Sequence, residues 1–511
     1  MQQLMSYLNG AWQAGKEPQT PLYNAATGAV IAQTSSNGLD LAAALQFGRA
    51  VGGPALRALT FAQRGEILGK LASVIVANRD ALLDVSEHNM GTTRGDGKFD
   101  VDGASGTLAF YAKLGATLGD QTLVLDGDQV QFSRSKRFVG QHLFSPRRGV
   151  AIHINAFNFP CWNLCEKLAC ALLAGVPVIA KPGTATAQTA HRLVQLWVEA
   201  AIVPDGVLQL LCGGAGDLLD HVQAQDCVVF TGSGSTGQQI KGHPAILRHN
   251  VPVNVEADSL NAAVLGPDVA PGSDIYTMFL AEVVREMTQK AGQKCTAIRR
   301  ILVPHALFAD VKDELVARLQ DAKIGQPGEA GVAVGPVAGP SQQRDVAAGI
   351  AALGQHAEIV WQAGELPDQG CFVRPTLFAT DKGIAAQHVH DHEVFGPVAT
   401  LLAVRGDADE VAAVVARGGG SLACSVFSDD AAWAKQVILA VAPYTGRVYW
   451  ASAKVFDQGT GHGAVMPALV HGGPGKAGGG EELGGERGLR FYWQRTAVQG
   501  DTQLLRGLLE R

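Results

Sequence analysis

Three segments indicate the architecture of the chain: Gly149-Val-Ala-Ile-His-Ile154, Val176-Pro-Val-Ile-Ala180 and Cys227-Val-Val-Phe230. Each of these three runs is short and apolar, which is typical of a strand that is buried on both faces. Strands of this kind belong to a parallel sheet whose faces are covered by helices.

Helix-forming segments separate these runs. Between residues 186 and 201, apolar side chains recur at spacings of one, three and four, which indicates an amphipathic helix. A further strand is predicted over 207–212 and a short helix over 217–222. Because strands alternate with helices, the sequence predicts βαβ units and an α/β fold.

The rest of the chain repeats this alternation more loosely and predicts a second α/β domain. Its predicted elements are a helix over 276–291, a strand over 300–303, a helix over 307–319 and a strand over 398–403. Weak polar–apolar alternation predicts a hairpin over 126–143. Nine glycines among residues 471–488 predict a loop there.

Length and composition exclude several classes of protein. A chain of 511 residues exceeds what one core usually organises, so we expect two or three domains. The net charge of −6 provides no basic field for a nucleic acid or an anionic membrane, and neither partner is expected. The N-terminus lacks the pattern of a secretory signal, and eight cysteines show no zinc or disulfide spacing, so we expect a cytoplasmic protein.

A cysteine follows a glycine turn between a predicted helix and a predicted strand, in Ala291-Gly-Gln-Lys-Cys-Thr-Ala-Ile-Arg299. Cys295 is either a nucleophile presented at a cleft or a small buried hydrophobic residue. A nucleophilic thiol needs a positive environment, which Lys294 or a helix N-terminus could supply.

Three further segments stand at predicted strand ends. Phe230-Thr-Gly-Ser-Gly-Ser-Thr-Gly237 is either a phosphate-binding turn before a helix or an ordinary glycine-rich connection. Glu256 is either a general base with a raised pKa or a charge that faces water. Asn158 either donates to an oxyanion or forms a turn before Pro160.

Two other groups carry less weight. His388, His390 and His392 would share one face of a strand and could bind zinc, but no fourth ligand follows at a suitable spacing. Cys161 and Cys165 are neighbours on a predicted helix, where core packing explains them better than a metal. We therefore expect no metal site.

Six segments, taken together and in this order, resemble the aldehyde dehydrogenase superfamily over nearly the whole chain. They are FNFP (157–160), AKP (180–182), FTGSGSTG (230–237), Glu256, GQKC (292–295) and EVFGPV (393–398).

The resemblance implies roles for individual residues. Cys295 would be the nucleophile, Glu256 the general base, and Asn158 the oxyanion donor together with the Cys295 backbone N–H. Lys167 resembles the family's lysine near the thiol. The residues expected to bind the cofactor are Lys181, Thr184, Gly232, Ser233, Gly237, Glu393 and Phe395.

The resemblance also implies a domain plan. A cofactor-binding domain with a five-stranded Rossmann-like sheet would comprise residues 1–122 and 144–258, and a catalytic domain residues 259–455. Residues 123–143 and 480–511 would form a small β-element that bridges subunits of a homodimer or homotetramer.

One departure from the family pattern bears on the cofactor. Thr184 stands where many members have a glutamate that pairs with the adenosine ribose of NAD. Removing a carboxylate removes the repulsion against a 2′-phosphate and leaves a hydroxyl donor. The sequence therefore predicts NADP as cofactor, with NAD as the alternative.

Other departures bear on the substrate. Ala-Asp-Ser-Leu-Asn after Glu256 and HGGPGKAGGGEELGG at 471–485 resemble the dehydrogenases that oxidise coenzyme A-linked semialdehydes in aerobic aromatic degradation. MQQL at the N-terminus and QRTAVQG at 494–500 resemble the phenylacetate branch, which implies 3-oxo-5,6-dehydrosuberyl-CoA semialdehyde. The benzoyl-CoA branch implies 3,4-dehydroadipyl-CoA semialdehyde instead. The glycines leave open whether Glu481 or Glu482 is the family's additional active-site glutamate.

Length adds one expectation. Phenylacetate-branch proteins usually continue into a C-terminal hydratase domain, and because this chain ends at Arg511 we expect no hydratase activity.

Two other functions are weighed against this one. A CoA-acylating dehydrogenase passes the acyl group to free CoA and needs no base for water, so Glu256 speaks against it. A catalytically silent relative would not need Cys295, Glu256 and Asn158 together.

Overall fold

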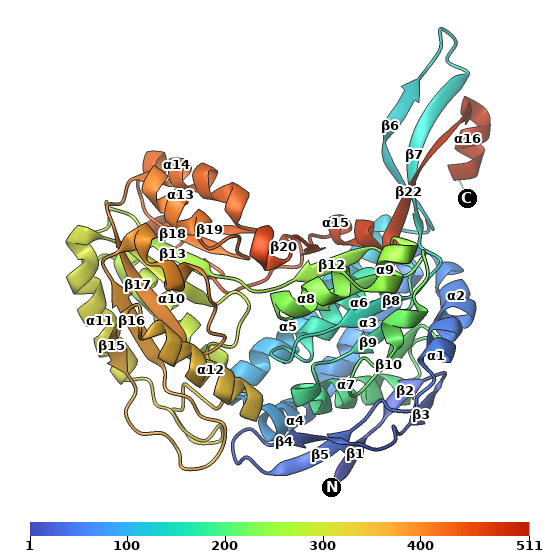
Figure 1. Cartoon of the computed structure of the whole chain (residues 1–511). Coiled ribbons are helices and arrows are strands. Elements are labelled where there is room, and N and C mark those ends of the chain that lie inside the picture. The colour runs from blue at the N-terminus through green and yellow to red at the C-terminus, as the bar shows by residue number, and fades with distance from the viewer. Residues whose placement is uncertain (510–511) are drawn as a thin grey trace.

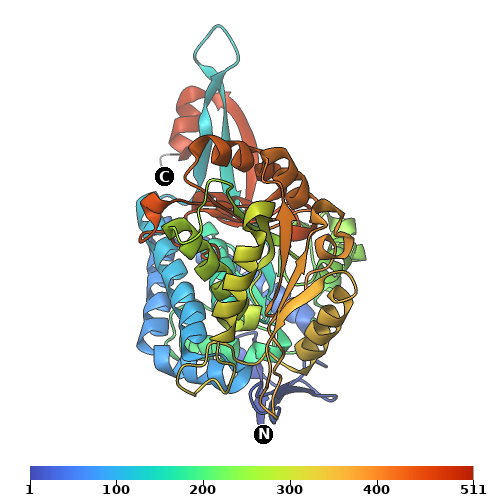
Figure 2. The same ribbon diagram turned by 90° about the vertical axis from the view of Figure 1, so that its left-hand side faces the viewer.

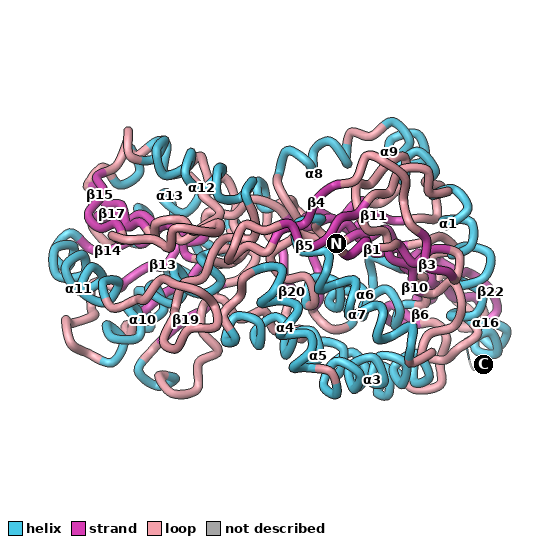
Figure 3. Tube along the Cα trace, turned by 90° about the horizontal axis from the view of Figure 1, so that it is seen from below, coloured by secondary structure: helices cyan, strands magenta, loops and turns pink. Residues whose placement is uncertain are grey.

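The computed structural model describes residues 1–509, with side chains up to residue 507, and shows two lobes that each surround a sheet (Figures 1 and 3). The first lobe carries the N-terminal half and the second the segment from about residue 261 to 451. The predicted α/β class is confirmed.

The first sheet has seven strands in the order β12-β11-β8-β9-β10-β2-β3. Five of them are parallel, and the hairpin of β2 and β3 joins antiparallel at the β10 edge. The sheet is therefore larger than the five strands expected, because an N-terminal hairpin extends it. The bounds are β2 Ser6–Leu8, β3 Ala11–Gln13, β8 Ala151–Ile154, β9 Val178–Lys181, β10 Leu208–Leu210, β11 Cys227–Thr231 and β12 Val253–Glu256.

Helices cover both faces of this sheet, as its apolar strands require. Ala151 belongs to a core with the helices α3, α5, α6 and α7, whereas its neighbour Ile152 belongs to a core with α1, α8 and α9. Successive residues of a strand point to opposite faces, so both faces are buried. The helices are α1 Leu41–Phe47, α3 Phe61–Ala77, α5 Arg94–Leu118, α6 Trp162–Ala174, α7 Ala187–Glu199, α8 Gly234–Lys241 and α9 Pro244–His249.

The second sheet also has seven strands, in the order β15-β16-β17-β14-β13-β18-β19, and only β15 is antiparallel. Helices α10 and α11 pack on one face, and α12, α13 and α14 on the other. The strands are β13 Asn261–Leu265, β14 Ile298–Pro304, β15 Glu358–Gln362, β16 Thr376–Thr380, β17 Val398–Val404, β18 Cys424–Phe427 and β19 Val448–Ala451. The helices are α10 Asp274–Thr288, α11 Phe308–Gln320, α12 Pro340–Leu353, α13 Ala408–Ala416 and α14 Ala431–Val441.

A third sheet projects from the first lobe (Figures 1 and 2). The hairpin predicted over 126–143 is present as β6 (Val124–Gln131) and β7 (Phe138–Pro146). Strand β22 (Trp493–Asp501), close to the C-terminus, pairs antiparallel with β7 along its whole length. Segments about 350 residues apart in sequence therefore build one arm.

Two predicted elements are wrong. Residues 217–222 form a single 3-10 turn (Leu218–His221) rather than a short α-helix. Residues 471–488 are not all loop: β20 (Val470–Gly472) pairs antiparallel with β21 (Glu481–Leu483), and α15 (Glu486–Leu489) follows. The glycines permit this ribbon because a Cβ on Gly472 would lie 2.1 Å from the Gly480 carbonyl oxygen.

Among the described residues, no helix has both the length and the apolar character needed to cross a membrane.

Candidate active site

The predicted catalytic side chains meet between the two lobes, at the carboxyl ends of the first sheet's strands. Asn158 follows β8, Glu256 ends β12, and Cys295 precedes β14 of the second sheet. The carboxyl edge of a parallel sheet is where open α/β folds bind their ligands.

The loop that carries Cys295 has an unusual backbone. Lys290, Ala291 and Gly292 all have positive φ angles, of 54°, 50° and 67°. Two consecutive non-glycine residues in this region are strained, at roughly 1–3 kcal/mol each, and such strain is typical of functional sites. Gly292 is also required sterically, because a Cβ there would lie 2.2 Å from the Gly396 carbonyl oxygen.

Two buried side chains brace this loop. Asn261 donates through Nδ2 to the carbonyls of Cys295 and Ala297, at 2.8 and 2.9 Å. The Arg299 guanidinium donates to the carbonyls of Gly292 and Gly396, at 3.0 and 2.7 Å. The position of the thiol is thus set by hydrogen bonds from the second sheet.

Cys295 itself is partly exposed, whereas the other seven cysteines of the chain are buried. Its Sγ lies 3.8 Å from Nε2 of His471 in β20. Burial of the sulfur, followed by the negative charge of Glu256, raises the pKa of the thiol well above its usual value. The thiol therefore needs a proton acceptor before its sulfur can act as a nucleophile.

Glu256 is 2% exposed, so the interpretation of a strand-end charge facing water is wrong. Its Oε1 lies 3.2 Å from Nε2 of His471. Burial alone would favour the neutral acid, but the charges of His471 and Lys167 outweigh it and lower the pKa of Glu256. The raised pKa that we considered is therefore also wrong, and Glu256 is a carboxylate.

Asn158 contacts the Cys295 loop from the first lobe, whereas Asn261 contacts it from the second. Its Nδ2 donates to the Gln293 carbonyl at 3.0 Å, which leaves the second N–H of the amide free to donate. The Asp100 carboxylate accepts from the backbone N–H of Cys161 and Trp162 at the start of α6. This capping fixes the turn that carries Asn158.

Lys167 lies in a buried cluster of carboxylates beside Glu256. Its Nζ lies 3.0 Å from both Glu166 and Glu482, and these two acids keep its pKa raised despite complete burial. Glu482 therefore reaches the site, whereas Glu481 is exposed. Glu166, Glu256 and Glu482 lie close enough to share a metal ion, as do Glu256, Cys295 and His471, but Lys167 already supplies a cation to the carboxylate cluster.

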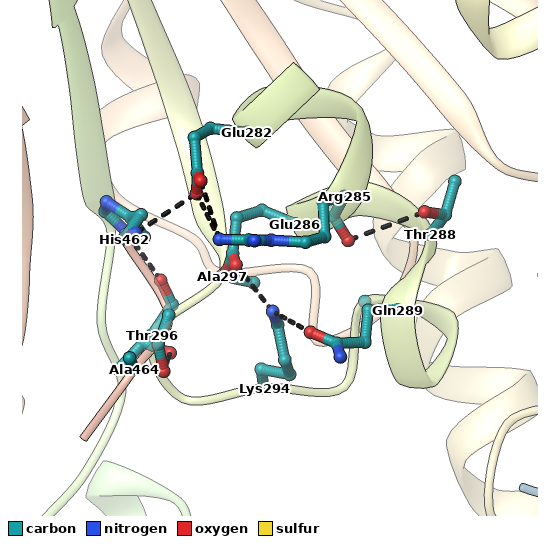
Figure 4. A network of polar contacts seen from close by, with 12 residues as sticks. Glu282, Arg285, Glu286, Thr288, Gln289, Lys294, Thr296, Ala297, His462 and Ala464 are labelled. Atoms are coloured by element: carbon teal, nitrogen blue, oxygen red, sulfur yellow. Dashed lines mark hydrogen bonds and ion pairs between the residues drawn. The ribbon is translucent and has the colours of Figure 1, made fainter. Parts of the chain in front are cut away.

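Lys294 does not provide the positive charge that we considered for the thiol. Its Nζ donates to Glu286 at 2.6 Å and to Gln289 at 2.9 Å, inside the second lobe (Figure 4). His462 completes this network by contacting the carbonyl of Thr296, the residue after the cysteine, at 2.7 Å. This network of the second lobe therefore stabilises the loop that carries Cys295.

The predicted cofactor residues gather at the same edge of the first sheet. Lys181 ends β9, and Thr184 lies in the following 3-10 turn with its hydroxyl donating to the Gly213 carbonyl at 3.2 Å. Ser233 caps α8 by accepting from the Thr236 N–H. A Cβ on Gly232 or Gly237 would clash with the Phe230 ring or the Val255 side chain, so this turn needs both glycines.

Unpaired polar atoms mark this edge as a binding surface. Both polar side-chain atoms of Asn155 and the hydroxyl of Thr231 are buried without a hydrogen-bond partner among the described residues. They stand beyond β8 and at the end of the adjacent strand β11. Buried polar groups are rarely left unpaired, so a polar ligand fits here.

Glu393 and Phe395 lie on the second lobe opposite this edge. Glu393 accepts from the Ser259 N–H and from Arg299, yet burial raises its pKa to about 7. The Phe395 ring meets the Phe157 ring edge to face at 5.8 Å. Phe157 and Phe395 are therefore one point of contact between the two lobes.

The three histidines at 388–392 do not form the predicted strand face. His388 and His390 lie in a 3-10 turn, where His390 is buried against Arg300 and the Gly383 carbonyl. His388 instead stacks between His356 and His392. Cys161 and Cys165 are both fully buried in the core of the first lobe, as packing predicts.

His471, Asn261 and Arg299 were not predicted as site residues. His471 belongs to the unusual phrase HGGPGK, whose departure from the family pattern was the available signal. Asn261 likewise ends the unusual phrase Ala-Asp-Ser-Leu-Asn, whereas Arg299 carries no sequence signal for its role.

Known proteins agree with this architecture. The model of the aldehyde dehydrogenase family matches residues 12–498. The chain is 46% identical over 480 residues to a 3,4-dehydroadipyl-CoA semialdehyde dehydrogenase of Aromatoleum evansii, covering 92% of this chain and 93% of that protein. It is 27% identical over 412 residues to a hydroxyisobutyraldehyde dehydrogenase of Mycolicibacterium austroafricanum, covering 78% and 76%.

A solved structure shares the fold. The betaine aldehyde dehydrogenase of Staphylococcus aureus, determined in complex with NAD⁺, superposes with a TM-score of 0.84 at 22% identity, covering 97% of this chain and 94% of that one. From the family match and the curated relatives, we conclude that this chain is an oxidoreductase that belongs to the aldehyde dehydrogenase family.

Proposed function

We propose that the protein oxidises a coenzyme A-linked semialdehyde to the acid with NADP, through a thioester on Cys295. The observation that carries the chemistry is the convergence of a partly exposed thiol, a free amide N–H on Asn158 and the buried carboxylate of Glu256. Each group serves a different step.

Cys295 forms the first bond. Its thiolate adds to the aldehyde carbon, and the resulting oxyanion needs hydrogen-bond donors. The second N–H of Asn158 is one donor. The Cys295 backbone N–H is the other, and within residues 1–509 it makes no hydrogen bond.

A bound nicotinamide dinucleotide supplies the acceptor for the hydride that leaves when the oxyanion collapses. Glu256 then releases the acid by taking a proton from the water that attacks the thioester. Oε1 pairs with His471, whereas Oε2 has no hydrogen-bond partner among the described residues, so Oε2 is available to that water. The lowered pKa keeps the carboxylate in its basic form.

The proposed use of NADP rests on Thr184 and Lys181. No carboxylate stands at position 184 to repel a 2′-phosphate, and the Lys181 ammonium at the end of β9 can attract one. We assign Gly232, Ser233 and Gly237 to the pyrophosphate, and Glu393 and Phe395 to the nicotinamide half.

Two CoA semialdehydes are candidates. Identity of 46% over nearly the full length of a relative named for 3,4-dehydroadipyl-CoA semialdehyde supports that compound as the first to test. The local phrases at the two termini support 3-oxo-5,6-dehydrosuberyl-CoA semialdehyde, which becomes the second.

The test is a comparison of kcat/KM for both CoA semialdehydes and a simple aldehyde, with NADP and with NAD. We expect the highest value with a CoA semialdehyde and NADP, and none after Cys295→Ala. A simple aldehyde that is oxidised equally well would refute the substrate class. Product formed only when free CoA is added would replace hydrolysis with CoA acylation.

We also propose the division into a cofactor domain (1–122 and 144–258), a catalytic domain (259–455) and a bridging element (123–143 and 480–511). The placement of β12 and β13 in different sheets supports the boundary at 258, and the pairing of β22 with β7 supports the bridging element.

We propose a homodimer or homotetramer that assembles through the same arm. The arm exposes Leu125, Val130, Phe132 and Phe138, and helix α16 (Thr502–Leu509), which follows β22, exposes Leu504. Exposed apolar side chains gathered on one projection favour a protein partner. Analytical ultracentrifugation tests this oligomeric state, and a monomer at micromolar concentration would refute it.

Eight free cysteines support a reducing, cytoplasmic setting for the protein.

A further inference from the structure

One imidazole nitrogen faces both reactive groups of the site. Nε2 of His471 lies 3.8 Å from the Cys295 sulfur and 3.2 Å from Oε1 of Glu256, and the side chain is 5% exposed. The β20–β21 ribbon positions it, since His471 pairs across the ribbon with Glu482. Cross-strand partners lie on the same side of a ribbon, so both side chains point at the Glu256 carboxylate.

The site needs a cation that the other basic residues do not provide. A thiolate on Cys295 would lie beside Glu256, with Glu166 and Glu393 adding to the repulsion. Two anions in a buried site repel strongly unless a positive charge stands between them.

The neighbouring cations are engaged elsewhere. Lys167 pairs with Glu166 and Glu482, Lys294 with Glu286, and Arg299 with Glu393, as shown by N–O distances of 2.6–3.1 Å. The Arg447 guanidinium donates to the carbonyls of His462 and Ala464. Among the described residues, only His471 has a basic nitrogen in contact with both the thiol and the catalytic carboxylate.

We propose that His471 is a further catalytic residue, whose Nε2 takes the proton from the Cys295 sulfur and then stands as an imidazolium between the thiolate and Glu256. The proposal rests on the proposed function, because it assigns the proton of that reaction's nucleophile.

The step conserves atoms and charge. The S–H bond of Cys295 breaks, an N–H bond forms on His471, and the pair remains neutral as thiolate and imidazolium. The sulfur lone pair then forms the C–S bond with the aldehyde carbon, while the proton stays on the imidazole. When water attacks the thioester, the C–S bond breaks and the electron pair returns to a sulfur that again faces the imidazolium.

The charges around His471 favour its cationic form. Burial opposes protonation, but Glu256 on β12 and then Glu166 on α6 outweigh it, while Arg447 acts in the other direction, and the pKa of the imidazole is raised. Glu482 on β21 also faces the ring, and Lys167 lies behind these acids. The same charges therefore stabilise the imidazolium that forms when the neutral ring accepts the thiol proton.

Alkylation of Cys295 by iodoacetamide tests this without aldehyde or cofactor. The rate reports the fraction of thiolate and is measured at Cys295 by peptide mass spectrometry from about pH 5.5 to 10. In the native protein we expect the rate to rise with pH and to reach a plateau within this range. In His471→Gln the rate near pH 7 should fall at least about tenfold, and its midpoint should move up by about one pH unit or more.

Two further variants complete the design. His305→Asn, an exposed histidine at the start of another 3-10 turn, is the matched control and should keep the native profile. His471→Ala removes the ring, and added imidazole should restore part of the alkylation rate of this variant. The alanine variant also replaces the glutamine variant if the latter does not fold. A profile unchanged in both His471 variants would overturn the proposal.

The outcome is separable from that of the proposed function. If the profile shifts while no CoA semialdehyde is oxidised by the native protein, the thiol–imidazole pair stands and the substrate assignment fails. If oxidation is confirmed and the profile does not shift, His471 is not the proton acceptor.

Discussion

Asn261 is buried at the start of β13, and its side chain makes four hydrogen bonds. Two of them reach the loop that carries Cys295, and the other two involve Ser259 and Ala423. Asn261 donates through Nδ2 to the carbonyls of Cys295 and Ala297, and its Oδ1 accepts from the Ala423 N–H at 2.8 Å and the Ser259 hydroxyl at 2.6 Å. We predict that Asn261→Ala destabilises the protein and also lowers activity.

The magnitude follows from these contacts. A net hydrogen bond contributes about 1 kcal/mol, and a buried group left without a partner costs about 1–3 kcal/mol, so losing four bonds should lower the free energy of unfolding by about 4 kcal/mol. A displacement of the sulfur by about 1 Å should lower kcat/KM by about 100-fold.

Urea unfolding measured by tryptophan fluorescence gives the first quantity, and steady-state kinetics gives the second. Asn37→Ala is the matched control, because its side chain is exposed and makes one hydrogen bond, to the Pro18 carbonyl. We expect the control to change stability by less than about 0.5 kcal/mol. An Asn261→Ala variant with native stability and native kcat/KM would refute the role assigned to this side chain.

Three further substitutions test the site. Asn158→Ala removes an oxyanion donor and should lower kcat by about 10²–10³, and an unchanged kcat would remove Asn158 from the oxyanion site. Thr184→Glu restores a carboxylate beside the expected 2′-phosphate and should shift the ratio of kcat/KM values from NADP toward NAD; an unaltered ratio would contradict this placement. Glu393 has a pKa raised from 4.5 to about 7, so the folded protein binds its proton more tightly than the unfolded chain does. Its contribution to stability is therefore full below pH 4.5 and is lost as the pH rises through 7, by on the order of 3 kcal/mol. Glu393→Gln should flatten this decline in urea unfolding measured between those pH values, and an identical pH dependence in both proteins would argue against it.

The sequence predicts the centre of the first sheet well. The runs predicted at 149–154, 176–180 and 227–230 are almost entirely apolar, and they correspond to the strands β8, β9 and β11 that the structure buries on both sides. A short run that is apolar on both faces favours a parallel strand that helices cover on both sides.

Other helices could not be predicted from periodicity. Helix α5 contains five glycines, which interrupt its apolar stripe and disfavour a helix. Packing decides the outcome there, because Gly115 and Gly65 let α5 approach α3 closely: a Cβ on Gly115 would lie 2.7 Å from the Phe61 carbonyl oxygen.

The sequence singles out Cys295, Glu256 and Asn158 because each residue type suggests a chemical use at a predicted strand end or turn, and their roles stay predictions. The site was not predictable where function depends on distance. His471 follows Cys295 by 176 residues, and only the fold brings the imidazole to the sulfur. The lowered pKa of Glu256 likewise depends on its contact with His471.

The late position of the β20–β21 ribbon has a consequence for synthesis of the enzyme. Both sheets are built from residues that precede 452, yet the ribbon that carries His471 and Glu482 leaves the ribosome after them. A nascent or prematurely terminated polypeptide would therefore hold its sulfur and carboxylate without the imidazole between them, so a damaged message would yield fragments with an incomplete catalytic centre.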